Sequence, residues 1–234
     1  MDVYPDYESL SKAAAEFILA QALIAAAMKG RFVLAVSGGN TPKRAYEYLA
    51  GLTEMPWALT HILQSDERYV PPTDPSSNEG MLRAQLLSHV PLPEGNFHAM
   101  YSPGGQERAA ELYGEVVERT LGEGGVIDLL MLGIGPEGHT ASLFPGSPAL
   151  EETQRLAVPA QGAPPVTQRI TLTPPTLTAA RATMFLLSGA EKAPILSTVL
   201  SPDCDLPAAR IAHGSGNVRW FVDQAAEGAT RPMT

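Results

Sequence analysis

His139 is the side chain with the clearest chemical potential in this sequence, because of the residues that lead up to it. The run 126–132 is almost wholly apolar and is typical of a buried strand. Gly133, Gly135 and Gly138 then let the backbone turn sharply and approach a ligand with no Cβ in the way. An imidazole titrates close to neutral pH, so it can act as a base there. The pattern predicts a reaction site at the end of a strand, with His139 in it.

The same three glycines also match G-x-G-x-x-G, the fingerprint of a dinucleotide site. That fingerprint requires a helix after the glycines, then a second strand and an acidic residue about 20 positions further on. Here Pro145, Gly146 and Pro148 interrupt the chain almost at once, and no apolar strand ends near position 153. The sequence therefore favours a turn that presents His139 over a nucleotide site.

A second turn of this kind follows the apolar run 33–36. It is predicted to bind an anion through five residues: Ser37, Gly38, Gly39, Asn40 and Thr41. Thr41 is a suitable N-cap and Pro42 suits the first position of a helix over 43–49, so free N–H groups and the positive end of a helix dipole would converge on one spot. The turn lacks the Gly-Lys-Ser/Thr ending of a nucleotide P-loop. An ordinary strand-to-helix turn remains the alternative.

Three adjacent charges, Asp66, Glu67 and Arg68, follow the predicted strand 59–63. The carboxylates could orient a base or take a proton, and the guanidinium could meet an oxyanion or a phosphate. A surface loop with a local ion pair is the alternative. A further helix is expected to open at Ser77-Asn78-Glu79 and to reach about Leu87, with Ser76 or Ser77 as its N-cap.

These residues need a scaffold of alternating strands and helices. Helices are expected at 6–29, 105–121 and 191–200, strands at 169–173, 182–187 and 218–222, and a Pro/Gly-rich loop at 159–165. Alternation of this kind, with ligand-type turns after strands, predicts an α/β protein: a single three-layer Rossmann-like domain over 1–234, with a mostly parallel sheet and helices on both faces.

Composition limits the partners. The 234 residues carry a net charge of −9, and the 16 Lys and Arg are scattered singly, which argues against nucleic acid. The single cysteine, Cys204, cannot form an intrachain disulfide. The apolar segment 17–28 is interrupted by Gln21 and is expected to fall far short of a membrane span, and Asp2 and Asp6 stand where a signal peptide would carry cations. These features predict a cytoplasmic protein with no membrane partner.

Several segments together carry a resemblance to a known family. They are Ser37-Gly-Gly-Asn-Thr-Pro42, Ser65-Asp-Glu-Arg68, the stretch 133–146, Arg169-Ile-Thr-Leu-Thr173, Gly189-Ala-Glu-Lys192-Ala and Val218-Arg-Trp-Phe-Val-Asp223. In this order they resemble the 6-phosphogluconolactonase family, over nearly the whole chain. The resemblance implies hydrolysis of 6-phosphogluconolactone to 6-phosphogluconate in the oxidative pentose phosphate pathway, with no metal and no organic cofactor. It also implies a small sugar phosphate lactone as the partner, bound by a monomer or a weak homo-oligomer.

The resemblance also implies roles for the residues. His139 would deprotonate the attacking water, with Asp66 or Glu137 orienting it, and Arg68 or backbone N–H groups would stabilise the oxyanion. The loop 37–41, Arg169 and Lys192 would hold the phosphate. Most relatives have Asp where this chain has Glu137, so the carboxylate is kept on a longer arm. A serine nucleophile is disfavoured because no G-x-S-x-G elbow occurs.

Two rival functions are distinguishable. A glucosamine-6-phosphate deaminase would share the sheet and the phosphate loop, but that family follows its Gly-His with a string containing Asn-Glu-Pro, and this chain has Thr140-Ala-Ser-Leu-Phe-Pro145. A non-catalytic sugar-phosphate sensor would give His139 no task. The remaining histidines lack a comparable setting and are expected to be structural or exposed: His61, His89, His98 and His213.

Overall fold

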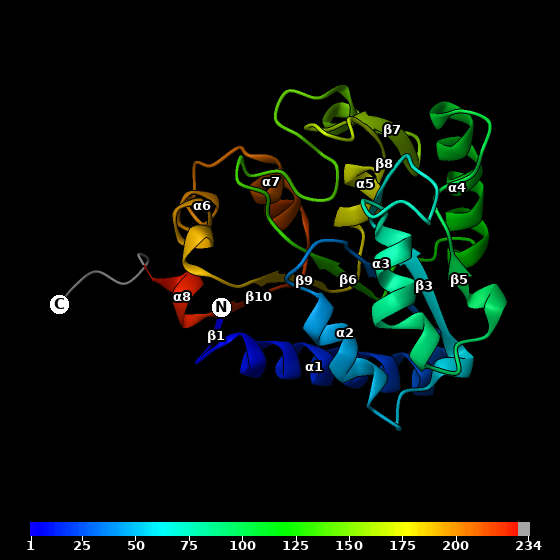
Figure 1. Cartoon of the computed structure of the whole chain (residues 1–234), viewed down its shortest axis with the longest axis horizontal. Helices are drawn as coiled ribbons and strands as arrows, with labels where there is room; N and C mark the ends of the chain where they lie inside the picture. Colours follow the sequence, from blue (N-terminus) through cyan, green and yellow to red (C-terminus); the bar gives the residue numbers. More distant parts are fainter. Residues whose placement is uncertain (229–234) are drawn as a thin grey trace.

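The centre of the protein is a sheet of seven parallel strands, shown in Figure 1 for the computed structural model, which describes residues 1–228. The strands lie in the order β1, β10, β9, β6, β2, β3, β5. Their bounds are β1 Asp2–Tyr4, β2 Phe32–Val36, β3 Thr60–Gln64, β5 Phe97–His98, β6 Leu129–Leu132, β9 Thr183–Leu187 and β10 Val218–Asp223. The last six residues of the predicted domain, 229–234, lie outside the described residues.

The inner strands are continuous apolar runs because helices cover both of their faces. Every residue of β2, β6 and β9 is buried. The strand predicted over 126–132 begins only at Leu129. Before it, the buried carboxylate of Asp128 accepts a hydrogen bond from the Val33 N–H of β2 at 2.8 Å and lies 2.9 Å from Lys29 Nζ. Asp128 therefore joins the start of β6 to its neighbours through its side chain.

Helices form the two outer layers. Their bounds are α1 Tyr7–Lys29, α2 Lys43–Ala50, α3 Asn78–Gln85, α4 Gln106–Leu121, α5 Pro174–Thr178, α6 Ala193–Val199, α7 Pro207–Gly214 and α8 Gln224–Glu227. Apolar residues of α1, α2 and α3 share one core with one face of the sheet, and those of α4, α6 and α7 share a second core with the other face. The predicted α/β fold, with a mostly parallel sheet and helices on both faces, is confirmed.

Helix α1 has clear start and stop signals. The Asp6 side chain accepts a hydrogen bond from the Ser9 N–H at 2.7 Å, and Gly30 ends the helix with φ of 68°. By length and composition alone this helix could cross a membrane, which corrects the expectation that 17–28 falls far short of a span. In the fold, however, its residues Leu10, Ile18 and Ala22 are fully buried on the sheet, as in the core helix of a globular protein.

A second, antiparallel sheet of three strands was not predicted. It consists of β4 Asp66–Arg68, β8 Gln168–Leu172 and β7 Ala157–Gln161, in that order. The charged segment after β3 is therefore a strand rather than a surface loop. The loop predicted over 159–165 is also wrong at its start, because Pro159 lies in β7. That strand is at the edge of its sheet, where a residue without an N–H is tolerated.

The starts of α2 and α6 differ from the prediction, and the start of α3 agrees with it. Helix α2 begins at Lys43 with Pro42 as its cap and no side-chain cap, so the predicted capping by Thr41 is wrong. Ser77 caps α3 as predicted, accepting a hydrogen bond from the Gly80 N–H at 3.1 Å. The helix expected over 191–200 is divided into a 3₁₀ turn, Ala190–Lys192, and α6.

The order of the strands fixes where a ligand can enter. The chain builds outward from β2 through β3 to β5, and then returns to add β6, β9 and β10 on the other side of β2. The reversal lies between β2 and β6, whose following turns diverge to opposite faces. The loop after β2 and the loop after β6 therefore border a crevice at the carboxyl end of the sheet.

Candidate active site

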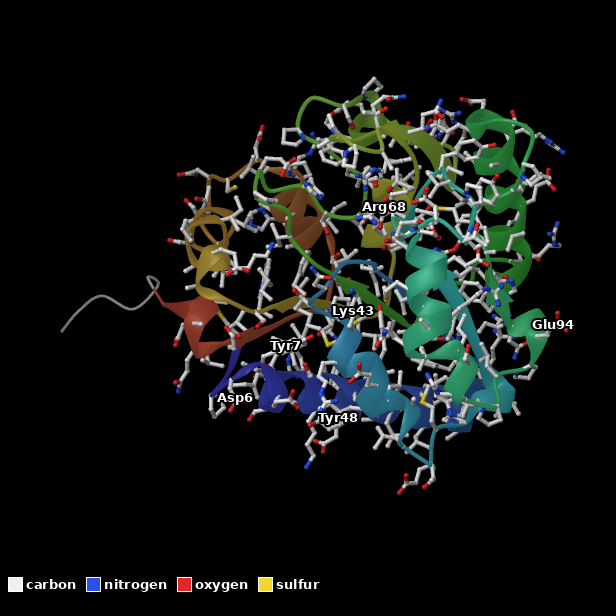
Figure 2. All side chains as sticks on the ribbon, viewed as in Figure 1. Asp6, Tyr7, Lys43, Tyr48, Arg68 and Glu94 are labelled. Atoms are coloured by element: carbon white, nitrogen blue, oxygen red, sulfur yellow. The ribbon has the colours of Figure 1, made fainter. Side chains whose placement is uncertain are left out.

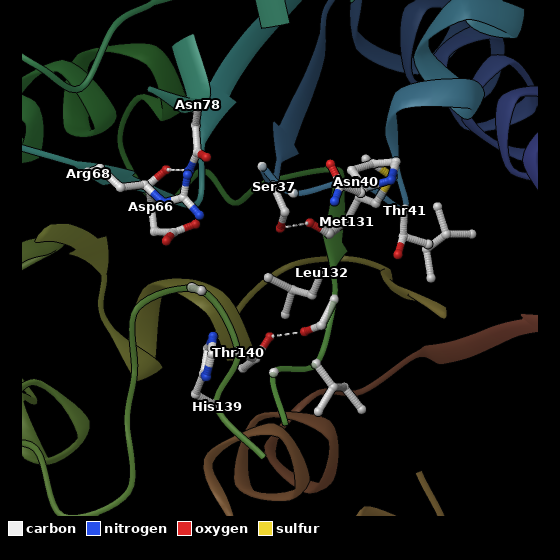
Figure 3. A pocket seen from close by; sticks show the side chains of 18 of the residues that line it. Ser37, Asn40, Thr41, Asp66, Arg68, Asn78, Met131, Leu132, His139 and Thr140 are labelled. Atoms are coloured by element: carbon white, nitrogen blue, oxygen red, sulfur yellow. Dashed lines mark hydrogen bonds between the residues drawn. The ribbon is translucent and has the colours of Figure 1, made fainter. Parts of the chain in front are cut away.

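A cavity of about 190 Å³ occupies this reversal point. In Figure 3, His139 and Thr140 lie on the loop after β6, and Ser37, Asn40 and Thr41 lie on the loop after β2, across the cavity. All the predicted site residues except Glu137 line it: Ser37, Gly38, Gly39, Asn40, Thr41, Asp66, Arg68, His139, Arg169 and Lys192. Five segments that are distant in the sequence thus meet in one place.

The loop after β2 presents free backbone donors to the cavity. Among the described residues, no hydrogen bond uses the N–H of Gly38 or Gly39. Tyr7 lies at the start of α1 (Figure 2). Its hydroxyl donates to the Thr41 carbonyl at 3.0 Å and accepts from the Arg44 N–H at 3.3 Å. Helix α1 therefore braces a loop whose N–H groups are available to an anion.

Gly38 is required for close packing in this loop. A Cβ at this position would overlap the side-chain amide of Asn78, the first residue of α3. The Asn78 Nδ2 donates to the Asp66 carbonyl at 2.9 Å, so this amide fastens the loop after β2 to β4. Asn78 lines the cavity, yet the sequence offered no signal for it, because its position depends on the approach of α3.

His139 is held by its backbone and by packing against its ring. Its carbonyl accepts from the Gly135 N–H at 2.8 Å, and the Gly138 N–H donates to the Gly135 carbonyl at 3.0 Å, with Gly138 at φ of 82°. The imidazole lies 4.3 Å from the Phe144 ring, centroid to centroid, and a Cβ on Gly135 would overlap it. The predicted turn therefore does present His139, whose side chain is 24% exposed.

Glu137 lies beside the imidazole although it does not line the cavity. Its Oε2 is 3.1 Å from His139 Nδ1, within ion-pair distance, although Nδ1 makes no hydrogen bond among the described residues. Burial raises the pKa of Glu137, but its own backbone N–H and the charges of His139 and Lys192 outweigh this and hold the pKa below its ordinary value. A carboxylate next to Nδ1 leaves Nε2 as the ring atom that can take a proton.

Three cations surround the cavity. Arg68 and Arg169 are directly opposite each other on the paired strands β4 and β8. Burial and the charge of Arg68 lower the pKa of Arg169. Lys192 Nζ donates to the Ile134 carbonyl at 2.9 Å, which places it at the loop that carries His139. Like charges directly opposite one another destabilise a sheet, and the charges of nearby carboxylates, Asp66 among them, partly offset this at Arg169.

Glu67 supports the site from behind. Its buried carboxylate accepts hydrogen bonds from the N–H groups of Arg68 (2.7 Å), Asn78 (2.7 Å) and Glu79 (2.6 Å). It also accepts from Gln64 Nε2 at 2.9 Å. Burial raises the pKa of Glu67 and these donors oppose the rise. In the charged segment 66–68, Asp66 and Arg68 therefore line the cavity, and Glu67 binds the start of helix α3.

The other histidines lie away from this cavity. His61 and His98 contact each other, with His61 Nδ1 3.2 Å from His98 Nε2, beside a second cavity lined also by Arg119 and Thr120. His89 and His213 are exposed. None of these histidines lines the cavity that contains His139.

The fold and the site together define an α/β protein with a small-ligand site at the reversal point of a parallel sheet. The chain belongs to the family of glucosamine-6-phosphate isomerases and 6-phosphogluconolactonases, whose family model matches residues 5–220.

The family description covers two activities, and similar proteins with each name are known. A 6-phosphogluconolactonase of Nostoc sp. is 36% identical over 97% of this chain and 96% of its own, and one of Homo sapiens is 35% identical over 97% and 92%. The solved 6-phosphogluconolactonase of Thermotoga maritima superposes with a TM-score of 0.83 at 30% identity, covering 95% of this chain and 98% of that one. A monomeric glucosamine-6-phosphate deaminase reaches a TM-score of 0.81, covering 97% and 99%, but is 22% identical and shares the fold alone.

Proposed function

We propose that this chain hydrolyses the ring ester of 6-phosphogluconolactone to give 6-phosphogluconate, as its lactonase relatives are named for doing. The observation that carries the proposal is that one cavity is lined by His139, by the loop 37–41 with its free N–H groups, and by three cations. A lactone is a reactive ester. Its hydrolysis needs a positioned water, a base and donors for the oxyanion.

In the proposed reaction, Nε2 of His139 takes a proton from a water molecule as the water oxygen attacks the lactone carbonyl carbon. Glu137, next to Nδ1, orients the ring and stabilises the imidazolium that forms. The negative charge that develops on the carbonyl oxygen meets Arg68 or a free backbone N–H of the glycine turns. The bond from the carbonyl carbon to the ring oxygen then breaks, and the imidazolium returns its proton to that oxygen.

The phosphate supplies the anchor in this proposal. It binds the free N–H groups of Gly38 and Gly39 in the loop 37–41, with Arg169 and Lys192 nearby. Repulsion between the paired Arg68 and Arg169 is relieved when the dianion arrives, so an arrangement that is unfavourable in the empty site becomes favourable in the complex.

The decisive experiment follows lactone opening by the purified chain against the spontaneous reaction, using freshly prepared 6-phosphogluconolactone. We expect clear acceleration over the background. The same preparation is given glucosamine 6-phosphate and amine release is measured, because the family includes the isomerases. If the chain releases amine and does not hydrolyse the lactone, it is a deaminase and the lactonase proposal is wrong. If it catalyses neither reaction, the remaining function is non-catalytic binding of a sugar phosphate.

We further propose that the molecule works in the cytoplasm as one domain over 1–234, as a monomer or a weak homo-oligomer, without metal or organic cofactor. Its partner would be the small sugar phosphate lactone, with neither nucleic acid nor membrane. Support for one domain comes from the pairing of β1 with β10, which joins the two ends of the described chain in one sheet.

A further inference from the structure

A chain of buried hydrogen bonds connects the loop of His139 to the loop after β2. Ser142 Oγ donates to Asp66 Oδ2 at 2.6 Å. Asp66 Oδ1 lies 3.3 Å from Ser65 Oγ, which lies 3.0 Å from Ser37 Oγ, and Ser37 donates to the Met131 carbonyl at 2.7 Å. Ser142 and Ser65 are fully buried, and Asp66 is 7% exposed. Two of the three serines thus contact Asp66, the one carboxylate among the described residues that lines the cavity, and Ser37 continues the chain to the loop after β2.

The hydroxyl protons in this series of hydrogen bonds can be assigned one by one. A carbonyl oxygen only accepts, so the Ser37 hydroxyl proton is committed to Met131. Ser65 then has one hydroxyl proton for two acceptors, Ser37 Oγ at 3.0 Å and Asp66 Oδ1 at 3.3 Å, so its bond to Oδ1 is long and shared. Oδ2 has a short bond from Ser142 at 2.6 Å, whereas Oδ1 has only the long one from Ser65 at 3.3 Å and keeps a lone pair for a further donor. Of the two oxygens, Oδ1 is therefore the acceptor that Asp66 offers to a ligand.

From this count we propose that Ser142 is a positioning residue for Asp66. It binds Oδ2 and so fixes the carboxylate with Oδ1 free to accept a hydrogen bond from the substrate or the attacking water. The inference rests on the proposed lactonase function. It assigns a task to a serine that touches no substrate and lies outside the cavity lining.

The backbone around Ser142 is built to hold that hydroxyl in place. The Ser142 N–H donates to Thr171 Oγ1 on β8 at 3.2 Å, and Thr140 Oγ1 donates to the Gly133 carbonyl at 2.8 Å. Between them Ala141 has φ of 47°, the one positive φ outside glycine in the described part of the chain. An alanine in this conformation is costly and persists only where its neighbours are fixed. Ser142 and His139 therefore move as one rigid turn, which sets the relation of Asp66 to the imidazole.

The test is a double-mutant cycle on lactone hydrolysis with wild type, Ser142→Ala, Asp66→Asn and the double variant. We expect Ser142→Ala to lower kcat about ten- to hundredfold, the range of one charge-assisted hydrogen bond, with little change in KM because the phosphate contacts remain. In the Asp66→Asn background the same change should cost less than about twofold, since the residue acts through Asp66. Ser142→Cys, which fills the space with a poor donor, replaces Ser142→Ala in the cycle if the alanine variant does not fold.

The matched control is Thr171→Val, which removes the other hydrogen bond of residue 142 and leaves the bond to Asp66. It should lower the unfolding midpoint but preserve most of kcat. Two results would overturn the inference: kcat losses of the two single variants that multiply in the double variant, or a kcat loss in Thr171→Val as large as that in Ser142→Ala. Either would mean that the Ser142 hydroxyl only holds the loop in place, and the lactonase function would still stand. A wild-type chain without lactonase activity overturns both.

Discussion

Two regions of this protein place histidine in opposite settings. His139 stands at the carboxyl end of the sheet with a carboxylate beside one ring nitrogen and a cavity in front of it. His61 is the second residue of β3 and His98 is the last residue of β5, and His61 Nδ1 lies 3.2 Å from His98 Nε2. Arg31 is close enough to lower the pKa of His61, after burial itself.

The difference shows that position in the sheet and charge environment, rather than residue type, decide what an imidazole can do. Burial, His61 and the charge of Arg119 lower the pKa of His98 to about 4, so this pair stays neutral and contributes to packing and hydrogen bonding. His139 instead has the Glu137 carboxylate 3.1 Å from its Nδ1 and lines a cavity that also holds cations. Four measurements would sharpen or break this contrast.

The largest effect is expected for His139→Ala. Loss of a general base lowers kcat by about 10²–10⁴-fold. Stability should change little, since the ring is partly exposed and packs mainly on Phe144. Steady-state lactone hydrolysis and a thermal melt measure both. The matched variant is His98→Gln, which should keep its activity at neutral pH. If His139→Ala folds and has near wild-type kcat, another group is the general base, and Asp66 is the first candidate.

Next in size is the loss of a phosphate contact. Arg169→Ala or Lys192→Ala should raise KM for the phosphorylated lactone by about ten- to hundredfold, because each removes a charge-assisted bond to a dianion. The unphosphorylated lactone should respond hardly at all. Kinetics on both substrates decide the matter, and equal losses on the two would place these cations elsewhere in the reaction.

A smaller effect is expected for Gly135→Ala. The added Cβ would overlap the His139 ring, so the imidazole must turn away from its place against Phe144. We expect kcat to fall about tenfold, in line with the sensitivity of catalysis to misplacement of about 1 Å. Gly95→Ala is the control, since a Cβ there meets nothing within 4 Å. Unchanged kcat in Gly135→Ala would show that the ring position is not critical.

The smallest effect concerns stability and pH at the second histidine region. The folded-state pKa of His98, about 4, lies below its ordinary 6.5, so between these values the unfolded chain binds more protons. The stability that the neutral pair provides is present above pH 6.5 and is lost as pH falls toward 4. Urea midpoints at several pH values should therefore decline less steeply for His98→Gln than for wild type. Parallel curves would contradict the assignment.

Much of the fold could be predicted because its signals are local. The helix that ends at Gly30, the buried strands and the glycine turn before His139 each follow from a short run of residues. The family resemblance added the identity of the cavity residues, and the structure brings nearly all of them together.

The parts that were missed depend on partners far along the chain. The strand Asp66–Arg68 exists only because β8, a hundred residues later, pairs with it, and Pro159 is acceptable in β7 only because that strand is an edge. Ser142 likewise reads as one more loop serine until Asp66 is seen beside it. Sequence patterns report what a residue requires, but they do not report which distant residue will supply it.

The pairing of the first strand with the last has a consequence for how the chain is made. Val3 lies opposite Val222 in the sheet, and Arg219 Nη2 is 2.8 Å from Asp2 Oδ2. During synthesis β1 emerges before β10 and stays unpaired until β10 has also been made. Closing so long a loop is entropically costly and slow. The edge of the sheet should thus be the last part to form, and a nascent chain truncated before β10 should remain open to chaperones and proteases at its N-terminal end.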